Sequence, residues 1–113
     1  VLTILKWESI VNSSKAGGVQ WDGILSCEFL GYYKPSRQAY LKATSLLGLR
    51  AEETMMVAAH EGDLAAARAA GMHTAHVSVP EKDNMSEGFD QPDNTEFDVQ
   101  AADFETLCQK LQV

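Results

Sequence analysis

The sequence predicts a doubly wound α/β protein, in which a parallel sheet carries helices on both faces. Apolar segments of strand length alternate with segments of helical periodicity along the 113 residues. The run TMMVAA, residues 54–59, is apolar from Met55 onward, which is typical of a strand covered on both faces and hence of a parallel sheet. The chain has the length of one domain with a single modest core.

The first half of the chain is predicted to contain two strands and two helices. Residues 1–5 form an apolar strand, and the helix that follows ends at Gly17-Gly18. Residues 23–27 have the composition of a second strand. After a turn at Lys34-Pro35, Ser36 is the candidate N-cap of a helix that ends at Gly48. The apolar positions of that helix are expected to face inward: Ala39, Tyr40, Ala43, Leu46 and Leu47.

The second half is predicted to contain three strands and two helices. The strand at residues 54–59 runs into His60, and the alanine-rich helix after it ends at Gly71. Residues 73–79 form the next strand, and residues 80–95 form an acidic, polar connection. Residues 96–111 close the chain as a short strand, a cap at Asp103 and a helix.

Charge and cysteine usage exclude several classes of protein. The net charge of -7 lies wholly in residues 81–113, and without a basic stripe the sequence argues against nucleic-acid binding. No run approaches the roughly 18 apolar residues of a membrane span, so no membrane contact is predicted. Cys27 and Cys108 have no CxxC partner, which predicts free, buried thiols in a reducing, cytoplasmic environment.

Polar residues lie near or past the carboxyl ends of several predicted strands, namely Thr3, Lys34, His60 and Asp63. The carboxyl ends of parallel strands meet at one edge of a sheet, where such folds hold their functional groups. An ammonium there can bind an anion, and an aspartate at a helix start is favoured by the helix dipole and can orient the lysine. Taken singly, each residue also has a structural explanation: Asp63 as a helix N-cap, Lys34 as a surface charge and Thr3 as a β-branched strand residue.

The sequence predicts no metal site. His60 and Asp63 together offer too few ligands for one. His73 and His76 have a metal-like spacing, but residues three apart on a strand point to opposite faces of the sheet. Gly17-Gly18 lacks the GxxxxGK pattern and ends a helix, so it does not form a phosphate loop.

Two segments are specific, especially at their mutual spacing: YYKP at residues 32–35 and VAAHEGDLAAARAAG at residues 57–71. With the sequence from about Lys15 to Val77 and the closing FDVQAADFETLCQKL, they make the chain resemble the type II haloacid dehalogenases of the haloacid dehalogenase-like hydrolase superfamily. The resemblance implies a Rossmann-like, three-layer core with a helical cap. It makes residues 1–113 the C-terminal part of such a core, with the first strand and the cap missing and residues 80–95 as an acidic loop.

The resemblance also implies a chemistry and the residues that perform it. In this family an aspartate after the first strand attacks C2 of an L-2-haloacid and expels halide. Water then hydrolyses the ester to the D-2-hydroxy acid, with no cofactor and normally no metal. The catalytic positions carried over are the lysine at Lys34, the acid that holds it at Asp63, the active-site tyrosine at Tyr40 and the hydroxyl at Thr3. The substrate-pocket positions are His60, Ala58 and Ala59.

The chain departs from the family pattern at three points. Thr3-Ile4 stands where the family has Ser or Thr followed by Asn, so the hydroxyl is kept and the amide is lost. Ala58 and His60 stand at the family's Ser and Asn. No aspartate precedes Asp22, which lies in a turn, so the nucleophile has no counterpart in this sequence.

These features leave three hypotheses. The first is a hydrolase of small 2-halo carboxylic acids, to which this chain supplies Lys34 and Asp63. The second is a degenerate, non-catalytic binding or regulatory fragment. The third is a magnesium-dependent phosphatase. It is the weakest, because a magnesium site needs an acidic ligand near position 60 and this chain has the neutral His60 there. Without the first strand the apolar edge of TMMVAA is exposed. The chain alone is therefore expected to be inactive, marginally stable, and self-associating or completed by an N-terminal half.

Overall fold

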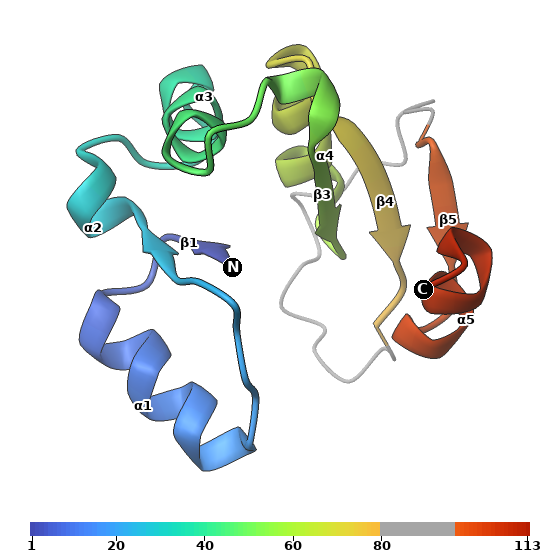
Figure 1. Ribbon diagram of the computed structural model, residues 1–113, viewed down its shortest axis with the longest axis horizontal. Helices are drawn as coiled ribbons and strands as arrows, with labels where there is room; N and C mark the ends of the chain where they lie inside the picture. The colour runs from blue at the N-terminus through green and yellow to red at the C-terminus, as the bar shows by residue number, and fades with distance from the viewer. Residues whose placement is uncertain (80–96) are drawn as a thin grey trace. The chain divides into compact units, whose positions relative to one another are not determined.

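The computed structural model describes residues 1–79 and 97–113, so the predicted acidic loop at 80–95 lies outside the described residues. The chain divides into two compact units, Val1–Leu49 and Arg50–Val113, each with its own parallel sheet. Among the described elements strands and helices mostly alternate, with two successive helices in the first unit and two successive strands in the second, as the labels in Figure 1 allow the reader to follow. The parallel pairing and the alternation confirm the predicted α/β class.

The first unit is built on a short parallel pair of strands. Leu2 pairs with Leu25 and Thr3 with Ser26, so the two strands end side by side. The elements are β1 (Leu2–Thr3), α1 (Trp7–Gly17), β2 (Leu25–Ser26), α2 (Cys27–Leu30) and α3 (Arg37–Leu46). Because β2 passes directly into α2, the predicted strand at 23–27 is shorter than expected. Ser26 ends it and caps α2, accepting a hydrogen bond from the Glu28 N–H at 3.2 Å.

The core of the first unit joins its strands to α2 and α3. Cys27, Leu30 and Ala43 are buried together, and Leu2 and Leu25 pack against them. Helix α1 buries Ile10 and Ser14, and the Ser14 hydroxyl accepts a hydrogen bond from Trp21 Nε1 at 2.8 Å. Ser14 in turn donates to the Ile10 carbonyl, which satisfies a polar side chain in the middle of the helix.

The second unit is a three-stranded parallel sheet in the order β3-β4-β5. Its register aligns Met55 with His73 and Ala58 with His76 on one side of β4, and Ala75 with Val99 on the other. The elements are the 3-10 helix η1 (Ala51–Glu53), β3 (Met55–Ala58), α4 (Glu61–Ala69), β4 (His73–Val77), β5 (Val99–Ala101) and α5 (Phe104–Leu111).

Strand β4 is the centre of this sheet and is covered on both faces. Thr74 and Ala75 are adjacent residues that point to opposite faces, and both are 0% exposed. On one face Ala75 and Val77 pack with Ala101 and with Leu107 of α5. Helix α4, which buries Leu64 and Ala67, contacts β3 and β4.

Strand β3 differs from its prediction. The apolar run was expected to be covered on both faces, yet Met56 is buried whereas Val57 remains 37% exposed. Met55 and Ala58, at the two ends of the strand, are partly buried, so the face that carries Val57 is less well covered than the face that carries Met56. An apolar sequence thus predicted the strand and its parallel pairing correctly, but did not determine how much packs on each face.

Helix α3 corrects two further predictions. Its buried stripe is Ala39, Tyr40, Ala43 and Thr44, whereas Leu46 and Leu47 are 58% and 59% exposed at the helix end. Hydrophobic periodicity predicts which side of the helix a side chain lies on. It does not predict whether another element packs against that side. Ser36 is the N-cap residue as predicted, but its hydroxyl donates to Gln38 Oε1 at 2.6 Å and makes no capping bond.

The cysteine prediction is half right. Cys27 and Cys108 are both free, and Cys27 is buried, but Cys108 is exposed on α5. Among the described residues, no helix has the length and the apolar character that crossing a membrane requires.

Candidate functional site

The predicted site residues fall into two sets, one in each compact unit. The unit Val1–Leu49 holds the hydroxyl, lysine and tyrosine positions: Thr3, Lys34 and Tyr40. The unit Arg50–Val113 holds the pocket and acid positions on one continuous segment: Ala58, Ala59, His60 and Asp63.

Thr3 lies where β1 ends, beside Ser26 at the end of β2. The Thr3 Oγ1 accepts a hydrogen bond from the Leu5 N–H at 3.1 Å, and the Ser26 hydroxyl donates to the Leu5 carbonyl at 2.7 Å. Both hydroxyls therefore hold the peptide groups that follow β1. Because Thr3 accepts in its bond, its own hydroxyl hydrogen can still be donated to an anion.

Lys34 and Tyr40 are placed by the entry into α3. Lys34 is half-buried in the segment between α2 and α3, where the Ser36 N–H donates to the Tyr33 carbonyl at 2.9 Å. Tyr40 is 0% exposed, in the first half of α3. A phenol at this depth is part of the core of its unit. A substitution there acts on packing as well as on any chemistry.

The segment from Ala58 to Asp63 leads from β3 into α4. His60 is the N-cap residue of α4 with an extended backbone, and its carbonyl accepts the Leu64 N–H at 3.3 Å. Asp63 is the third residue of α4, so the interpretation of Asp63 as the N-cap is wrong. A carboxylate in the first turn is stabilised by the helix dipole, and Glu61 shares that turn.

Sequence reasoning missed the group that holds this segment. His76 on β4 lies beside Ala58 in the register, and its Nε2 is 3.1 Å from the Ala59 carbonyl oxygen. In the sequence, His76 stands out only for its metal-like spacing from His73. The register between β3 and β4 is the signal that could have found it, and that register becomes known only when the strands are paired.

His73 has a separate partner, Asp98, at the amino end of the sheet. Its Nδ1 lies 3.4 Å from Asp98 Oδ2, and the same oxygen accepts the Thr74 N–H at 2.8 Å. The backbone hydrogen bond from Thr74, with the nearby charges of His73 and Arg68, lowers the pKa of Asp98. Neither histidine is part of a metal cluster. In residues 1–79 and 97–113, no three side chains of His, Cys, Asp or Glu come together to hold an ion.

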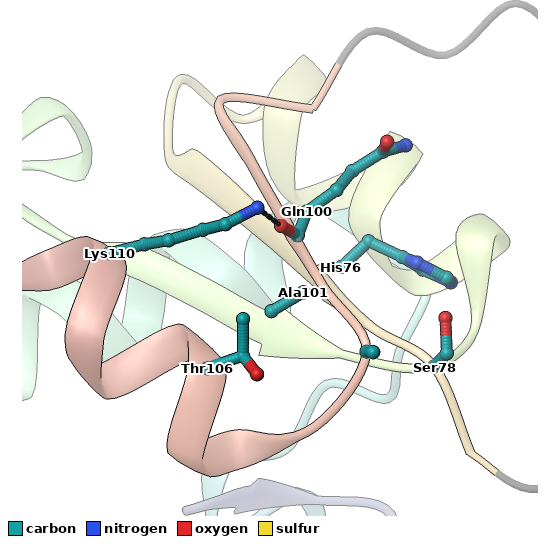
Figure 2. Close-up of a pocket in the computed structure, with 7 residues that line it drawn as sticks. His76, Ser78, Gln100, Ala101, Thr106 and Lys110 are labelled. Atoms are coloured by element: carbon teal, nitrogen blue, oxygen red, sulfur yellow. Dashed lines mark hydrogen bonds between the residues drawn. The ribbon is translucent and has the colours of Figure 1, made fainter.

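An open pocket of about 490 Å³ lies at the carboxyl ends of β4 and β5, beside α5. Figure 2 shows Lys110 reaching from α5 to the backbone of β5, where its Nζ donates to the Gln100 carbonyl at 2.6 Å. The pocket is lined by His76, Ser78, Gln100, Ala101, Ala102, Thr106 and Lys110, none of them acidic. The Lys110 ammonium keeps its positive charge and two further N–H donors in this contact, so the lining of the pocket is cationic.

The chain is similar to known proteins in sequence and in fold. A family model described as haloacid dehalogenase hydrolase-like matches residues 32–83, which include Lys34, His60 and Asp63. No curated protein sequence matches the chain.

Several solved structures resemble the chain. An L-2-haloacid dehalogenase is 34% identical with a TM-score of 0.89, over 97% of this chain and 48% of its own. A defluorinating L-2-haloacid dehalogenase is also 34% identical, with a TM-score of 0.78 over 94% of this chain and 43% of its own. A dehalogenase with an intermediate complex, 23% identical with a TM-score of 0.78, bears on the fold alone. These matches confirm the Rossmann-like α/β class. The chain spans about half the length of the dehalogenases it matches.

Proposed function

This chain belongs to the haloacid dehalogenase-like hydrolases, and on that premise we propose that it supplies the lysine and acid of an L-2-haloacid dehalogenase. The substrate class is a small 2-halo carboxylic acid. The observation that carries the proposal is the 34% identity with an L-2-haloacid dehalogenase over 97% of the chain. Lys34 and Asp63 lie within that span, and we propose that they take the roles of the family's lysine and last acid, as the resemblance implies.

The proposed reaction is a hydrolysis in two steps. A carboxylate oxygen of an aspartate attacks C2 of the haloacid, the carbon–halogen bond breaks, and halide leaves with the bonding electrons. Water then attacks the carbonyl carbon of the aspartyl ester, which releases the 2-hydroxy acid and restores the carboxylate. No residue of this sequence corresponds to the nucleophile, so the reaction is assigned to a protein that also contains that strand.

Lys34 has the electrostatic role in this proposal. Its ammonium neutralises the nucleophilic carboxylate and the carboxylate of the substrate, which would otherwise repel each other. The half-buried setting of Lys34 supports this role, because partial removal from water strengthens its attraction to anions. Thr3 is proposed to donate its hydroxyl hydrogen to the same negative charge.

Asp63 is proposed to orient the Lys34 ammonium and to help activate water for the second step. Its place in the first turn of α4 supports this, since the positive end of the helix dipole attracts a carboxylate there. His60, Ala58 and Ala59 are proposed to line the substrate pocket. They precede Asp63 on the same segment, at the carboxyl end of β3. Tyr40 is proposed to take the role of the family's active-site tyrosine.

The test is halide release from L-2-chloropropionate by a protein that contains this chain together with a nucleophile-bearing strand. We expect Lys34→Ala to lower kcat by at least about 100-fold, the usual effect of removing one group that stabilises developing charge. Lys42→Ala is the matched control, because Lys42 is an exposed lysine on α3 outside the motif. Halide release at the wild-type rate by the Lys34→Ala protein would show that the assigned role is wrong.

A non-catalytic binding role is the second candidate. The replacement of the family's Ser and Asn by Ala58 and His60 and the loss of an amide at Ile4 favour it, because they remove polar contacts from the pocket. Isothermal titration of 2-chloropropionate into the protein that also contains the nucleophile-bearing strand distinguishes the two. Binding that depends on Lys34, without halide release, would replace the dehalogenase proposal with the binding role.

A further inference from the structure

The carbonyl of Ala59 is held by a side chain from another strand. Ala59 is the residue between the end of β3 and the N-cap of α4, and His76 Nε2 lies 3.1 Å from its oxygen. A carbonyl oxygen can only accept a hydrogen bond, so Nε2 carries the hydrogen and donates it. This bond fixes the tautomer of a neutral His76, and it persists when the ring is protonated, because both ring nitrogens are then donors.

The orientation of the His76 ring is itself fixed by stacking. The rings of His76 and Phe97 are nearly parallel, with an interplanar angle of 16° and centroids 5.1 Å apart. Phe97 precedes β5 and is placed by its neighbour Asp98. The Asp98 N–H donates to the Thr74 carbonyl at 3.0 Å, and Asp98 Oδ2 accepts the Thr74 N–H at 2.8 Å. The pairing of β4 with the start of β5 thus sets the plane of the imidazole.

Two consecutive carbonyls are therefore fixed before α4 begins. The Ala59 carbonyl accepts a hydrogen bond from His76 Nε2, and the His60 carbonyl accepts one from the Leu64 N–H. Between them they determine the direction in which the chain leaves β3 and the orientation of the first turn of α4, which carries Asp63. Small displacements of such a segment matter, because productive geometry tolerates deviations of only about half an ångström.

We propose that His76 is a positioning residue, whose Nε2–H fixes the Ala59 carbonyl and thereby holds His60 and the first turn of α4. The inference rests on the proposed function only in its last step, the effect on catalysis. The contact and its local effect belong to this chain and can be measured in it directly.

Two substitutions separate the hydrogen bond from the stacking. His76→Phe keeps an aromatic ring against Phe97 and removes the N–H donor. His76→Gln removes the ring but keeps an amide N–H that can reach the position of Nε2. His73→Gln is the control for the loss of a histidine from the same strand, because His73 contacts Asp98 and points to the other face.

The first readouts need no enzymatic activity. Long-range ¹H–¹⁵N correlation spectra of the chain should show the Nε2–H form of neutral His76. Amide hydrogen exchange at residues 60–64 should be about fivefold to tenfold faster in His76→Phe, the effect of one lost neutral hydrogen bond. Exchange in His76→Gln and His73→Gln should stay close to that of the wild type. An Nδ1–H form, or equal exchange at residues 60–64 in His76→Phe and wild type, would overturn the proposal.

The catalytic readout follows in the protein that releases halide. We expect His76→Phe to lower kcat with little change in KM. We expect kcat of His76→Gln to stay close to that of the wild type. Failure of His76→Gln to restore kcat, with normal folding, would also refute a role through the N–H. If the exchange and tautomer results are as expected but the wild type releases no halide, the dehalogenase assignment is wrong and the local role of His76 stands.

Discussion

Asp98 and Asp103 each accept a backbone hydrogen bond that lowers the pKa of the carboxyl group. Asp98 accepts from the Thr74 N–H, and Asp103, the N-cap of α5, accepts from the Thr106 N–H at 2.7 Å. Asp103 was predicted correctly because a cap involves only residues three apart in the sequence. Asp98 was missed because its partner is 24 positions away and becomes its neighbour only when β5 pairs with β4.

These pKa values predict how stability depends on pH. The folded-state pKa of Asp98 lies below its ordinary value of 3.8, so its contribution is fully present above that value and is lost as the pH falls through the folded pKa. The free energy of unfolding should therefore fall below about pH 4, and less steeply in Asp98→Asn. Urea titrations of both proteins at pH 5, 4 and 3 measure this. Equal slopes in the two proteins would contradict the prediction.

The cap of α5 gives a second prediction at this scale. Asp103→Ala leaves the Thr106 N–H without its acceptor, and we expect the folding equilibrium constant to fall about fivefold, the usual effect of losing one N-cap side chain. Asp103→Ser restores a capping oxygen and should recover most of the loss. Denaturation midpoints at pH 7 compare the variants. A midpoint for Asp103→Ala equal to that of the wild type would show that the cap contributes nothing.

Among the elements, α4 shows how a local signal can fix a boundary. Gly71 follows the C-terminal end of α4 and has a φ of 98°, a backbone conformation that residues with a side chain rarely adopt. A Cβ added at Gly71 would lie 3.4 Å from the Ala51 Cβ. The sequence predicted this stop because glycine takes such conformations at little cost. The start of α4 carries no comparable signal, since its N-cap residue His60 makes no capping side-chain bond.

Alanine should therefore affect the stability of the protein differently at the two glycines of this region. Gly71→Ala should destabilise the protein by about 1–2 kcal/mol, because it forces a Cβ into a left-handed conformation. Gly62→Ala is the matched control. Gly62 lies inside α4 with nothing within 4 Å of an added Cβ, so alanine should be neutral or stabilising there. Thermal unfolding of the two variants tests the contrast, and equal shifts would contradict it.

At the scale of the whole molecule, the sequence predicted the alternation of strands and helices and the parallel pairing of the strands. Hydrophobic periodicity is local, and so are glycine stops. The register of β3 against β4 and the exposure of Leu46 and Val57 were not predictable, because they depend on what packs from elsewhere in the chain. For the site, motif spacing pointed to Lys34 and Asp63. It could not reveal the hydrogen bond between His76 and Ala59, which joins residues 17 positions apart.

The division into two sheets leads to the last prediction. Among the described residues, β3 pairs with β4 alone and β1 with β2 alone, so the apolar β3 has an edge without a strand partner. Unpaired apolar edges promote association between chains.

We expect the chain to self-associate in sedimentation velocity at micromolar concentration, and Val57→Lys to reduce the association, because a lysine on an edge strand opposes further pairing. Val19→Lys is the control, since Val19 is 46% exposed and lies outside the strands. A monodisperse monomer that unfolds in one sharp two-state transition would show that the edge of β3 is protected within the chain itself.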